Sequence, residues 1–341
     1  MKLIKQITYL FTLIILISII HGRSVSQLVA TQQSTKNVRR GLTKDTAHLE
    51  SKYLKLVVST NESYGDVHKA GYSGISEIYL KTGNDKNFFV PFYGGLNYEH
   101  IFSGDSTSYN WNIFETRKAP MQLVRISDRK VELRQARTQN WPLKSSISYE
   151  LTGNSIDFVF SATPLEDIWS KYGYIGIFFA SYINTPEQKG INFICRTRAG
   201  KGDTIPRWIY HLPKVHGISA NHRPAGSDWD PSLDTSGFPI SLVSGFSDLE
   251  YSYPFYYGLS GENVFILMFE KVGKDGELRF AQSPDGGGDD DPAWDFIYFR
   301  KNYKVGKKFS FRARAVFKKF AGVDDVIKTY EAWSGKKVGP L

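Results

Sequence analysis

The segment from Phe309 to Phe317 alternates apolar and polar side chains, and this pattern constrains the fold more than any other feature of the chain. Phe309, Phe311, Ala313, Ala315 and Phe317 recur at every second position. Successive side chains of a strand point to opposite faces of a sheet, so this segment predicts a strand with one buried face. The intervening Arg312 and Arg314 would either line an anion site on the outer face or meet solvent.

Shorter segments of the same kind recur along the chain. We expect strands at 53–59, 75–80, 121–127, 130–137, 146–151, 155–162, 174–182, 264–270, 277–282, 296–299 and 309–317. Hairpins are expected across Asp128-Arg129 and Gly153-Asn154, and one helix over 323–333 that ends at Gly335. The pattern predicts an all-β protein: a multi-stranded antiparallel β-sandwich with a C-terminal helix and long loops at 83–118 and 196–260.

The N-terminus resembles an export signal. Lys2 and Lys5 precede an apolar run from Leu10 to Ile20, which is shorter than a membrane-spanning helix requires. We predict a signal peptide at 1–22, a polar leader at 23–50 and a single large domain at 51–341. The mature chain would be periplasmic or secreted, with no membrane span.

The amino-acid composition limits how the domain can be stabilised and which molecules it can bind. Cys195 is the single cysteine, so an exported domain must rely on a large hydrophobic core instead of disulfides. The formal net charge of +9 favours an acidic oligo- or polysaccharide as partner over nucleic acid, because no long basic run is present. Aromatic residues make up 15% of the chain and suit both sugar stacking and a large β core.

Three of the seven histidines, His211, His216 and His222, lie within twelve residues of one another. Histidine titrates near neutrality and binds metals, so this cluster is a candidate for proton transfer or ligation, or else a polar loop. His216, His222, Asp228 and Asp230 are the residues that would hold a divalent metal; no cofactor is clearly required. The acidic run from Asp285 to Asp291 would suit calcium or a plain acidic loop.

Two further segments carry polar or aromatic groups that fit a binding site. After Gly94-Gly95, the residues Asn97, Tyr98, Glu99 and His100 would present an acid or sugar-binding groups, or form a satisfied turn. Pro142 keeps Trp141 extended, as a stacking platform or a core residue. Trp229 and Trp294 are further aromatic candidates for a saccharide surface. Nucleotide-binding glycine motifs and serine-hydrolase elbows are absent from the sequence.

With these residues in view, the chain from about Tyr53 to Phe317 resembles exported galactose-mutarotase-like supersandwich proteins of polysaccharide-degrading bacteria. The resemblance is carried by Gly71-Tyr-Ser-Gly-Ile-Ser-Glu-Ile78, by Gly94-Gly95 with Glu99, by the central histidines and by Pro292-Ala-Trp-Asp295. It implies a supersandwich fold and places the chain near uronate-glycan lyases and ulvan-oligosaccharide dehydratases.

The resemblance also implies a chemistry, β-elimination next to a uronate carboxylate. This reaction needs a cation on the carboxylate, a base and an acid. Arg207 or Arg223 would neutralise the carboxylate, His211 or His216 would be the base, and Tyr210 or His100 the acid. If water leaves instead of a sugar, the enzyme is a dehydratase.

Two alternatives remain at this point. A glycoside hydrolase would pair Glu99 with Asp228 or Asp230. A non-catalytic carbohydrate-binding protein would use Trp141, Trp229 and Trp294 as a platform, and Tyr98, Asn97, His222 and Arg223 would contact the saccharide in either case.

Overall fold

The computed structural model describes residues 45–61, 72–82, 86–105, 114–198, 200–234 and 238–341. The signal peptide and most of the leader predicted for 1–50 therefore lie outside the described residues. Asp45–Leu341 form one compact unit. The first strand of this unit is β1 (Thr46–Glu50), which pairs along its whole length with β2 (Leu54–Ser59). The folded unit therefore begins before residue 51, where the sequence placed the start of the domain.

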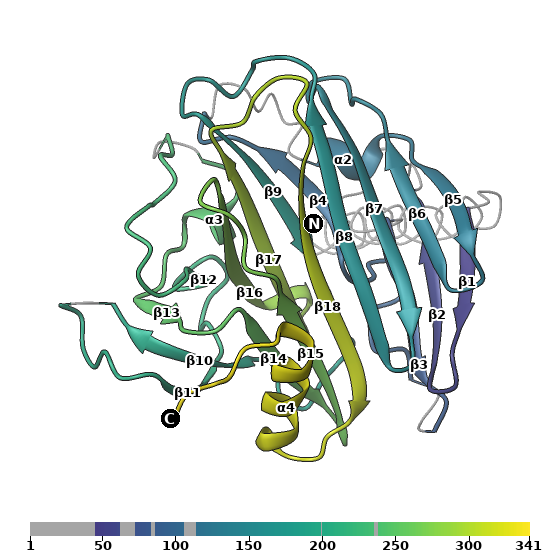
Figure 1. Ribbon diagram of the computed structural model, residues 1–341, viewed down its shortest axis with the longest axis vertical. Coiled ribbons are helices and arrows are strands. Elements are labelled where there is room, and N and C mark those ends of the chain that lie inside the picture. The colour runs from purple at the N-terminus through teal and green to yellow at the C-terminus, as the bar shows by residue number, and fades with distance from the viewer. Residues whose placement is uncertain (1–44, 62–71, 83–85, 106–113, 199, 235–237) are drawn as a thin grey trace, which may run out of the picture. The chain divides into compact units, whose positions relative to one another are not determined.

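The strands form three sheets in which neighbouring strands run antiparallel (Figure 1). The smallest has the order β1-β2-β3, with β3 at Gly74–Leu80. A ten-stranded sheet has the order β11-β10-β14-β15-β18-β8-β7-β6-β5, with β13 beside β10, and a five-stranded sheet has the order β12-β16-β17-β9-β4.

The bounds of the strands in the ten-stranded sheet are β5 Gln122–Ser127, β6 Lys130–Gln135, β7 Leu143–Thr152, β8 Ser155–Pro164, β10 Ile191–Thr197, β11 Arg207–His211, β13 Leu249–Tyr251, β14 Phe255–Ser260, β15 Asn263–Phe269 and β18 Phe309–Lys319. Those of the five-stranded sheet are β4 Asn97–Phe102, β9 Tyr174–Ala180, β12 Asn221–His222, β16 Gly276–Gly288 and β17 Asp291–Lys301. The helices are α2 Glu115–Lys118, α3 Ser241–Ser244 and α4 Val323–Ser334.

The core lies between the five-stranded and ten-stranded sheets and is rich in phenylalanine. Phe179 of β9 and Phe296 of β17 face Phe158 of β8 and Phe311 of β18, with ring centroids 5.1 Å (Phe158–Phe179) and 5.8 Å (Phe296–Phe311) apart. Even-numbered residues of β17 thus point into the sandwich, and its odd-numbered residues point to the other face of the sheet. The predicted all-β sandwich is confirmed.

The clearest local predictions are also confirmed. Both expected hairpins form, β5–β6 and β7–β8, and Gly153 takes the left-handed conformation (φ 63°) that the second turn requires. The alternating face of β18 is buried as predicted. Its outer arginines are neutralised, Arg312 by Glu270 and Arg314 by Asp157, so they form no anion site.

Helix α4 packs on the outer face of the ten-stranded sheet. Val326 and Tyr330 are its buried residues, and the Tyr330 ring stacks on Phe255 of β14 at 4.4 Å. Gly335 ends the helix in the left-handed conformation, as expected. Within the described part of the chain, we find no helix with the length and apolarity needed to cross a membrane.

The two predicted long loops are wrong, because both contain strands. Segment 83–118 holds β4, and 196–260 holds β11, β12, β13 and β14. All six residues of β4 are buried, including polar ones, so its sequence lacks the alternation of a half-exposed strand. Gly95 precedes this strand, and a Cβ there would lie 2.1 Å from the Phe89 ring, so glycine is needed for the close approach.

Candidate functional site

A pocket of about 330 Å³ lies on the face of the five-stranded sheet that points away from the core. Phe178 of β9 and Asp295 of β17 line it, and both lie on the outward face by the alternation of their strands. The residues that line this acid–base pocket are Glu99, His100, Phe114, Phe178, Tyr182, His216, Pro239, Ile240, Ser241, Leu242, Asp285, Gly286, Ala293 and Asp295.

Glu99 is the centre of a buried polar cluster on one wall. It occupies a β-bulge of β4 between Tyr98 and His100, which turns its side chain to the outer face. One carboxylate oxygen lies 3.0 Å from His100 Nε2. The other accepts a hydrogen bond from the Tyr182 hydroxyl at 3.1 Å and forms an ion pair with Arg117. The Glu99 carboxylate is therefore held as an anion.

Arg117 of α2 supplies the charge that balances Glu99. Its guanidinium group is buried, donates a hydrogen bond to the Tyr182 hydroxyl at 2.8 Å and lies 3.7 Å from the centre of the Tyr72 ring. An aromatic face attracts a desolvated cation, so the ring and the carboxylate together stabilise a charge that burial alone would disfavour. These contacts hold the Glu99 side chain in one position.

Asp295 lines the pocket as a second carboxyl group with a different environment. Burial, and then the negative charge of Glu99, raise its pKa well above the usual value. The Ser181 backbone N–H donates to its Oδ1 at 2.9 Å and opposes this effect only in part. Asp295 therefore favours the protonated form far more than an exposed aspartate does, and it lies in the same pocket as the ionised Glu99.

His216 lies on the opposite wall, held by a serine and an aspartate. The Ser283 hydroxyl donates to Asp285 Oδ1 at 3.0 Å and lies 2.8 Å from His216 Nδ1. Because the single hydroxyl proton is directed to Asp285, Ser283 accepts a hydrogen bond from the Nδ1–H of His216. The free lone pair is then on Nε2, and the half-exposed ring can take up a proton from a bound molecule.

The structure separates the three clustered histidines. His211 and His222 lie inside the sandwich, where Gln282 Nε2 is 2.7 Å from His211 Nδ1 and 3.1 Å from His222 Nε2. Burial lowers the pKa of both imidazoles, that of His222 well below its usual value. Gln282 and Ser283 are neighbours on β16, and their side chains point to opposite faces, which is why His216 alone reaches the pocket.

Arg207 and Tyr210 lie on the edge strand β11, away from the residues that line the acid–base pocket. Arg207 is exposed and 3.3 Å from Asp203, and the Tyr210 hydroxyl accepts a hydrogen bond from the Gly190 N–H at 3.0 Å. We therefore correct the prediction that these two residues act together with the histidines, with Arg207 as the cation and Tyr210 as the acid. Alternation along β11 directs Tyr210 and His211 to opposite faces.

Arg223 belongs to a buried ion network. Its guanidinium lies 3.1 Å from Asp230 and 3.2 Å from Glu250, and Asp230 also contacts Arg279 at 3.2 Å. The charges of Arg223 and Asp230 are therefore balanced within the protein, which argues against the predicted roles of Arg223 on a substrate carboxylate and of Asp230 as a metal ligand or hydrolase carboxylate. Asp228 is exposed, and Trp229 packs edge-on against Tyr174 and Phe299.

Four predicted binding residues are core residues, and these predictions are corrected. Trp141 stacks on Trp169, Trp294 lies under Gly258, and Tyr98 packs between Phe160 and Phe179. Asn97 is fully buried and donates to the Ala180 carbonyl at 3.1 Å. None of the four is exposed enough to form a stacking platform, since each points into a closely packed layer.

The metal candidates His216, His222, Asp228 and Asp230 do not converge. Among the residues that the structure describes, no group of three or more His, Cys, Asp or Glu side chains is arranged to hold a metal ion. The acidic run after Ser283 instead forms the bulged end of the β16–β17 hairpin and directs Asp285 to Ser283.

Sequence reasoning found Glu99, His100 and His216 in this pocket and missed several of their partners. The missed residues are Arg117, Tyr182, Ser283, Asp285 and Asp295. A signal was present for Asp285 and Asp295, because the acidic stretch and the Pro-Ala-Trp-Asp motif were both noted, and Ser283 lies at the start of that stretch. For Arg117 and Tyr182 the sequence holds no cue, since they approach Glu99 from distant segments.

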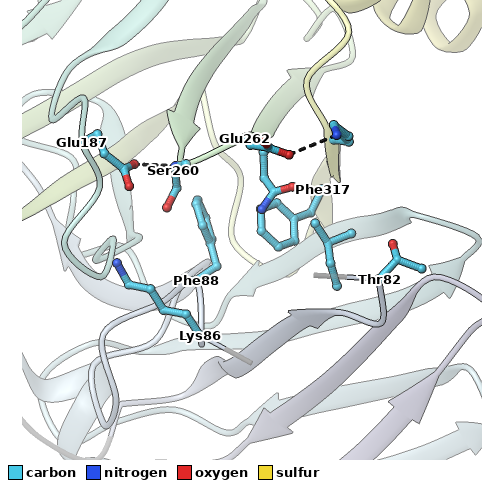
Figure 2. A pocket seen from close by; sticks show the side chains of 11 residues that line it. Thr82, Lys86, Phe88, Glu187, Ser260, Glu262 and Phe317 are labelled. Carbon is cyan, nitrogen blue, oxygen red and sulfur yellow. Dashed lines mark hydrogen bonds and ion pairs between the residues drawn. The ribbon is translucent and has the colours of Figure 1, made fainter. Parts of the chain in front are cut away.

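A second pocket of about 340 Å³ serves as a comparison (Figure 2). Lys86 and Glu187 lie on one side of it and Glu262 on the other, over the rings of Phe88 and Phe317. Glu262 pairs with Lys319 at 3.0 Å, and Glu187 accepts the Gly261 N–H. Its described lining contains no histidine and no buried carboxyl group, so it lacks the acid–base character of the first pocket.

No protein-family model matches the chain, and no curated protein matches it. Among solved structures, the Slr1438 protein of Synechocystis sp. PCC 6803 is 12% identical with a TM-score of 0.44, and covers 82% of this chain and 99% of its own. A galactose mutarotase related enzyme from Lactobacillus acidophilus is 10% identical with a TM-score of 0.41, over 81% and 98%.

Heparan sulfate lyase HepC from Pedobacter heparinus is also similar, at 10% identity and a TM-score of 0.41. The match covers 83% of this chain and 37% of the lyase. The resemblance to galactose-mutarotase-like proteins inferred from the sequence thus recurs among the structural neighbours, at low identity.

Proposed function

We propose that this protein is a carbohydrate-active enzyme that catalyses β-elimination on a uronate-containing saccharide in the acid–base pocket. One observation carries the proposal. The pocket combines a histidine whose Nδ1 is held by Ser283 with a buried carboxyl group, Asp295, whose pKa burial and the charge of Glu99 raise well above the usual value. The imidazole offers a free ring nitrogen as a base, and the buried carboxyl group, whose pKa is raised, favours the protonated form that an acid needs.

In the proposed reaction, His216 Nε2 takes the proton from the carbon next to the uronate carboxylate. The electron pair of that C–H bond forms the carbon–carbon double bond, and the C–O bond at the neighbouring carbon breaks. The Asp295 carboxyl group protonates the leaving oxygen. His100, which lines the same pocket beside Glu99, is the candidate for hydrogen bonding to the carboxylate.

A saccharide suits the pocket because its walls alternate apolar and polar surface. Phe114 and Phe178 offer aromatic faces for sugar C–H groups, while Glu99 and Tyr182 offer oxygen partners for hydroxyls. The basic net charge of the chain favours an acidic polymer. Ulvan-like algal glycans are the substrates that the family resemblance suggests, and we propose that the protein meets them after export.

The test is to incubate the purified protein with uronate polysaccharides and with their unsaturated oligosaccharides. Ultraviolet absorbance and mass spectrometry are followed together. Cleavage with a new ultraviolet chromophore and no added water supports a lyase, and loss of one water from an intact oligosaccharide supports a dehydratase. No change in any acidic glycan contradicts the proposal and favours a binding protein.

Glycoside hydrolysis is the second candidate, favoured by the carboxyl pair in the pocket. The charge of Glu99 helps to keep Asp295 protonated, which is the arrangement of an ionised and a neutral carboxyl group that hydrolysis uses. Asp295 takes the place that Asp228 or Asp230 had in the sequence-based hypothesis. Products that have gained one water and show no ultraviolet chromophore would support this reaction instead.

A further inference from the structure

We propose that a separate groove beside the C-terminal tail binds an anionic segment of a saccharide chain. The groove has a volume of about 850 Å³ and lies between the β15–β16 connection, the start of β14 and the end of α4. It shares no lining residue with the acid–base pocket. The inference therefore does not depend on the reaction proposed there.

The charge of the groove is positive. Lys271, Lys274 and Lys336 are exposed residues of its lining, and none forms a salt bridge with a carboxylate of the described residues. The two acidic residues of the lining are neutralised from outside it: Glu270 pairs with Arg312 at 2.7 Å, and Glu277 pairs with Arg279. Three cations thus remain for a ligand with regularly spaced anionic groups.

The lysines are carried by backbone segments that hydrogen bonds hold in place. The Gly339 N–H donates to the Tyr253 hydroxyl at 2.8 Å, and the Val338 N–H donates to Glu331 at 2.8 Å, so the tail that carries Lys336 is tied to the groove. A turn closed by the Gly276 N–H and the Gly273 carbonyl, 2.8 Å apart, positions Lys274. Such positioning reduces the entropy lost when a ligand binds.

The walls favour a saccharide over a membrane surface. Tyr253 and Pro254, both partly exposed, line the groove, and a concave surface with a tyrosine ring offers an aromatic face to a sugar. A bilayer is flat on this scale and would call for protruding apolar residues beside the lysines. Sulfate or carboxylate groups on a bound glycan would lie against the three ammonium groups.

The test is titration calorimetry of the full chain with a sulfated, uronate-containing tetrasaccharide derived from heparin. The triple variant Lys271→Ser/Lys274→Ser/Lys336→Ser should bind at least about tenfold more weakly, because each exposed ion pair accounts for a factor of two to five. The matched control, Lys304→Ser/Lys307→Ser/Lys308→Ser, removes the same charge from the β17–β18 turn and should bind like the parent. The parent's affinity should fall as salt rises.

The His216→Ala form of each protein is titrated in parallel, which separates binding from turnover. If His216→Ala keeps the groove-dependent binding, the groove is supported whether or not the acid–base proposal holds. If both triple variants lose the same amount of affinity, the effect comes from net charge alone, and the proposal of a binding groove is wrong. Binding of phosphatidylserine vesicles that depends on the same three lysines, without saccharide binding, would also overturn it.

Discussion

His216 Nδ1 lies 2.8 Å from the Ser283 hydroxyl, which in turn donates to Asp285. This contact joins the segment after β11 to the far end of β16 and orients the imidazole toward the pocket. It fixes the tautomer of His216, and with it the atom that can act as a base. The contact therefore predicts how the reaction responds to changes at either residue.

Replacing His216 by alanine should lower kcat on a saccharide substrate by about 100- to 10,000-fold, the usual contribution of a general base. The half-exposed ring contributes little to packing, so circular dichroism and thermal unfolding should be unchanged. His48→Ala, at an exposed histidine of β1, is the matched control. Full activity of His216→Ala would remove this residue from the mechanism.

Ser283→Ala should reduce kcat by about 10- to 100-fold with little change in KM, since it removes an orienting contact and no reacting group. The pH–rate profile should also change, because the imidazole loses its link to Asp285. Ser283→Thr, which keeps the hydroxyl, is expected to recover part of the activity. An unaltered pH profile in Ser283→Ala would show that the contact does not orient the base.

Asp295→Asn should abolish the acid step and yet stabilise the protein at neutral pH. The folded-state pKa of Asp295 is raised, so the folded protein retains a proton that the unfolded chain releases, and stability falls as pH rises above 3.8 toward the folded-state pKa. Asparagine removes this dependence and keeps the oxygen that accepts the Ser181 N–H. We expect the midpoint of thermal unfolding at neutral pH to rise by about 2 °C. A lower midpoint would contradict the assignment of a neutral carboxyl group.

Arg117→Met should cost about 3–5 kcal/mol of unfolding free energy, because it leaves Glu99 buried without its cation. The double variant Arg117→Met/Glu99→Gln should regain part of that loss in denaturant titrations. Arg312→Met, which breaks the exposed pair with Glu270, provides the comparison and should cost less than about 1 kcal/mol. Equal losses in the two single variants would argue against a buried ion pair.

Stability should decrease in acid because of His211 and His222. Burial lowers the pKa of both imidazoles below the value of 6.5, so the unfolded chain takes up protons that the folded protein does not, and stability is lost as pH falls through 6.5. His222→Gln should reduce the loss measured by thermal unfolding between neutral pH and about pH 5. His48→Gln should retain the full loss, and an unchanged slope in His222→Gln would contradict this origin.

The sequence by itself determined the fold class, because alternation is a local property. The faces of β18, the two hairpin turns at Asp128-Arg129 and Gly153-Asn154, and the end of α4 at Gly335 follow from residues close together in the chain. The pattern failed at β4, where burial on both faces removes the alternation. It also failed across 196–260, where short strands carry mixed side chains.

Only the tertiary structure decided which candidate residues meet. His211 and His216 are five positions apart, but one faces the core beside Gln282 and the other faces the pocket beside Ser283. Trp141 and Trp294 look like sugar platforms in sequence and are core residues in the fold. Glu99, Arg117 and Asp295 come together from three segments far apart in the chain, and the pKa of Asp295 depends on that meeting. Burial and the distance between charges are properties of the assembled sheets, and no local pattern encodes them.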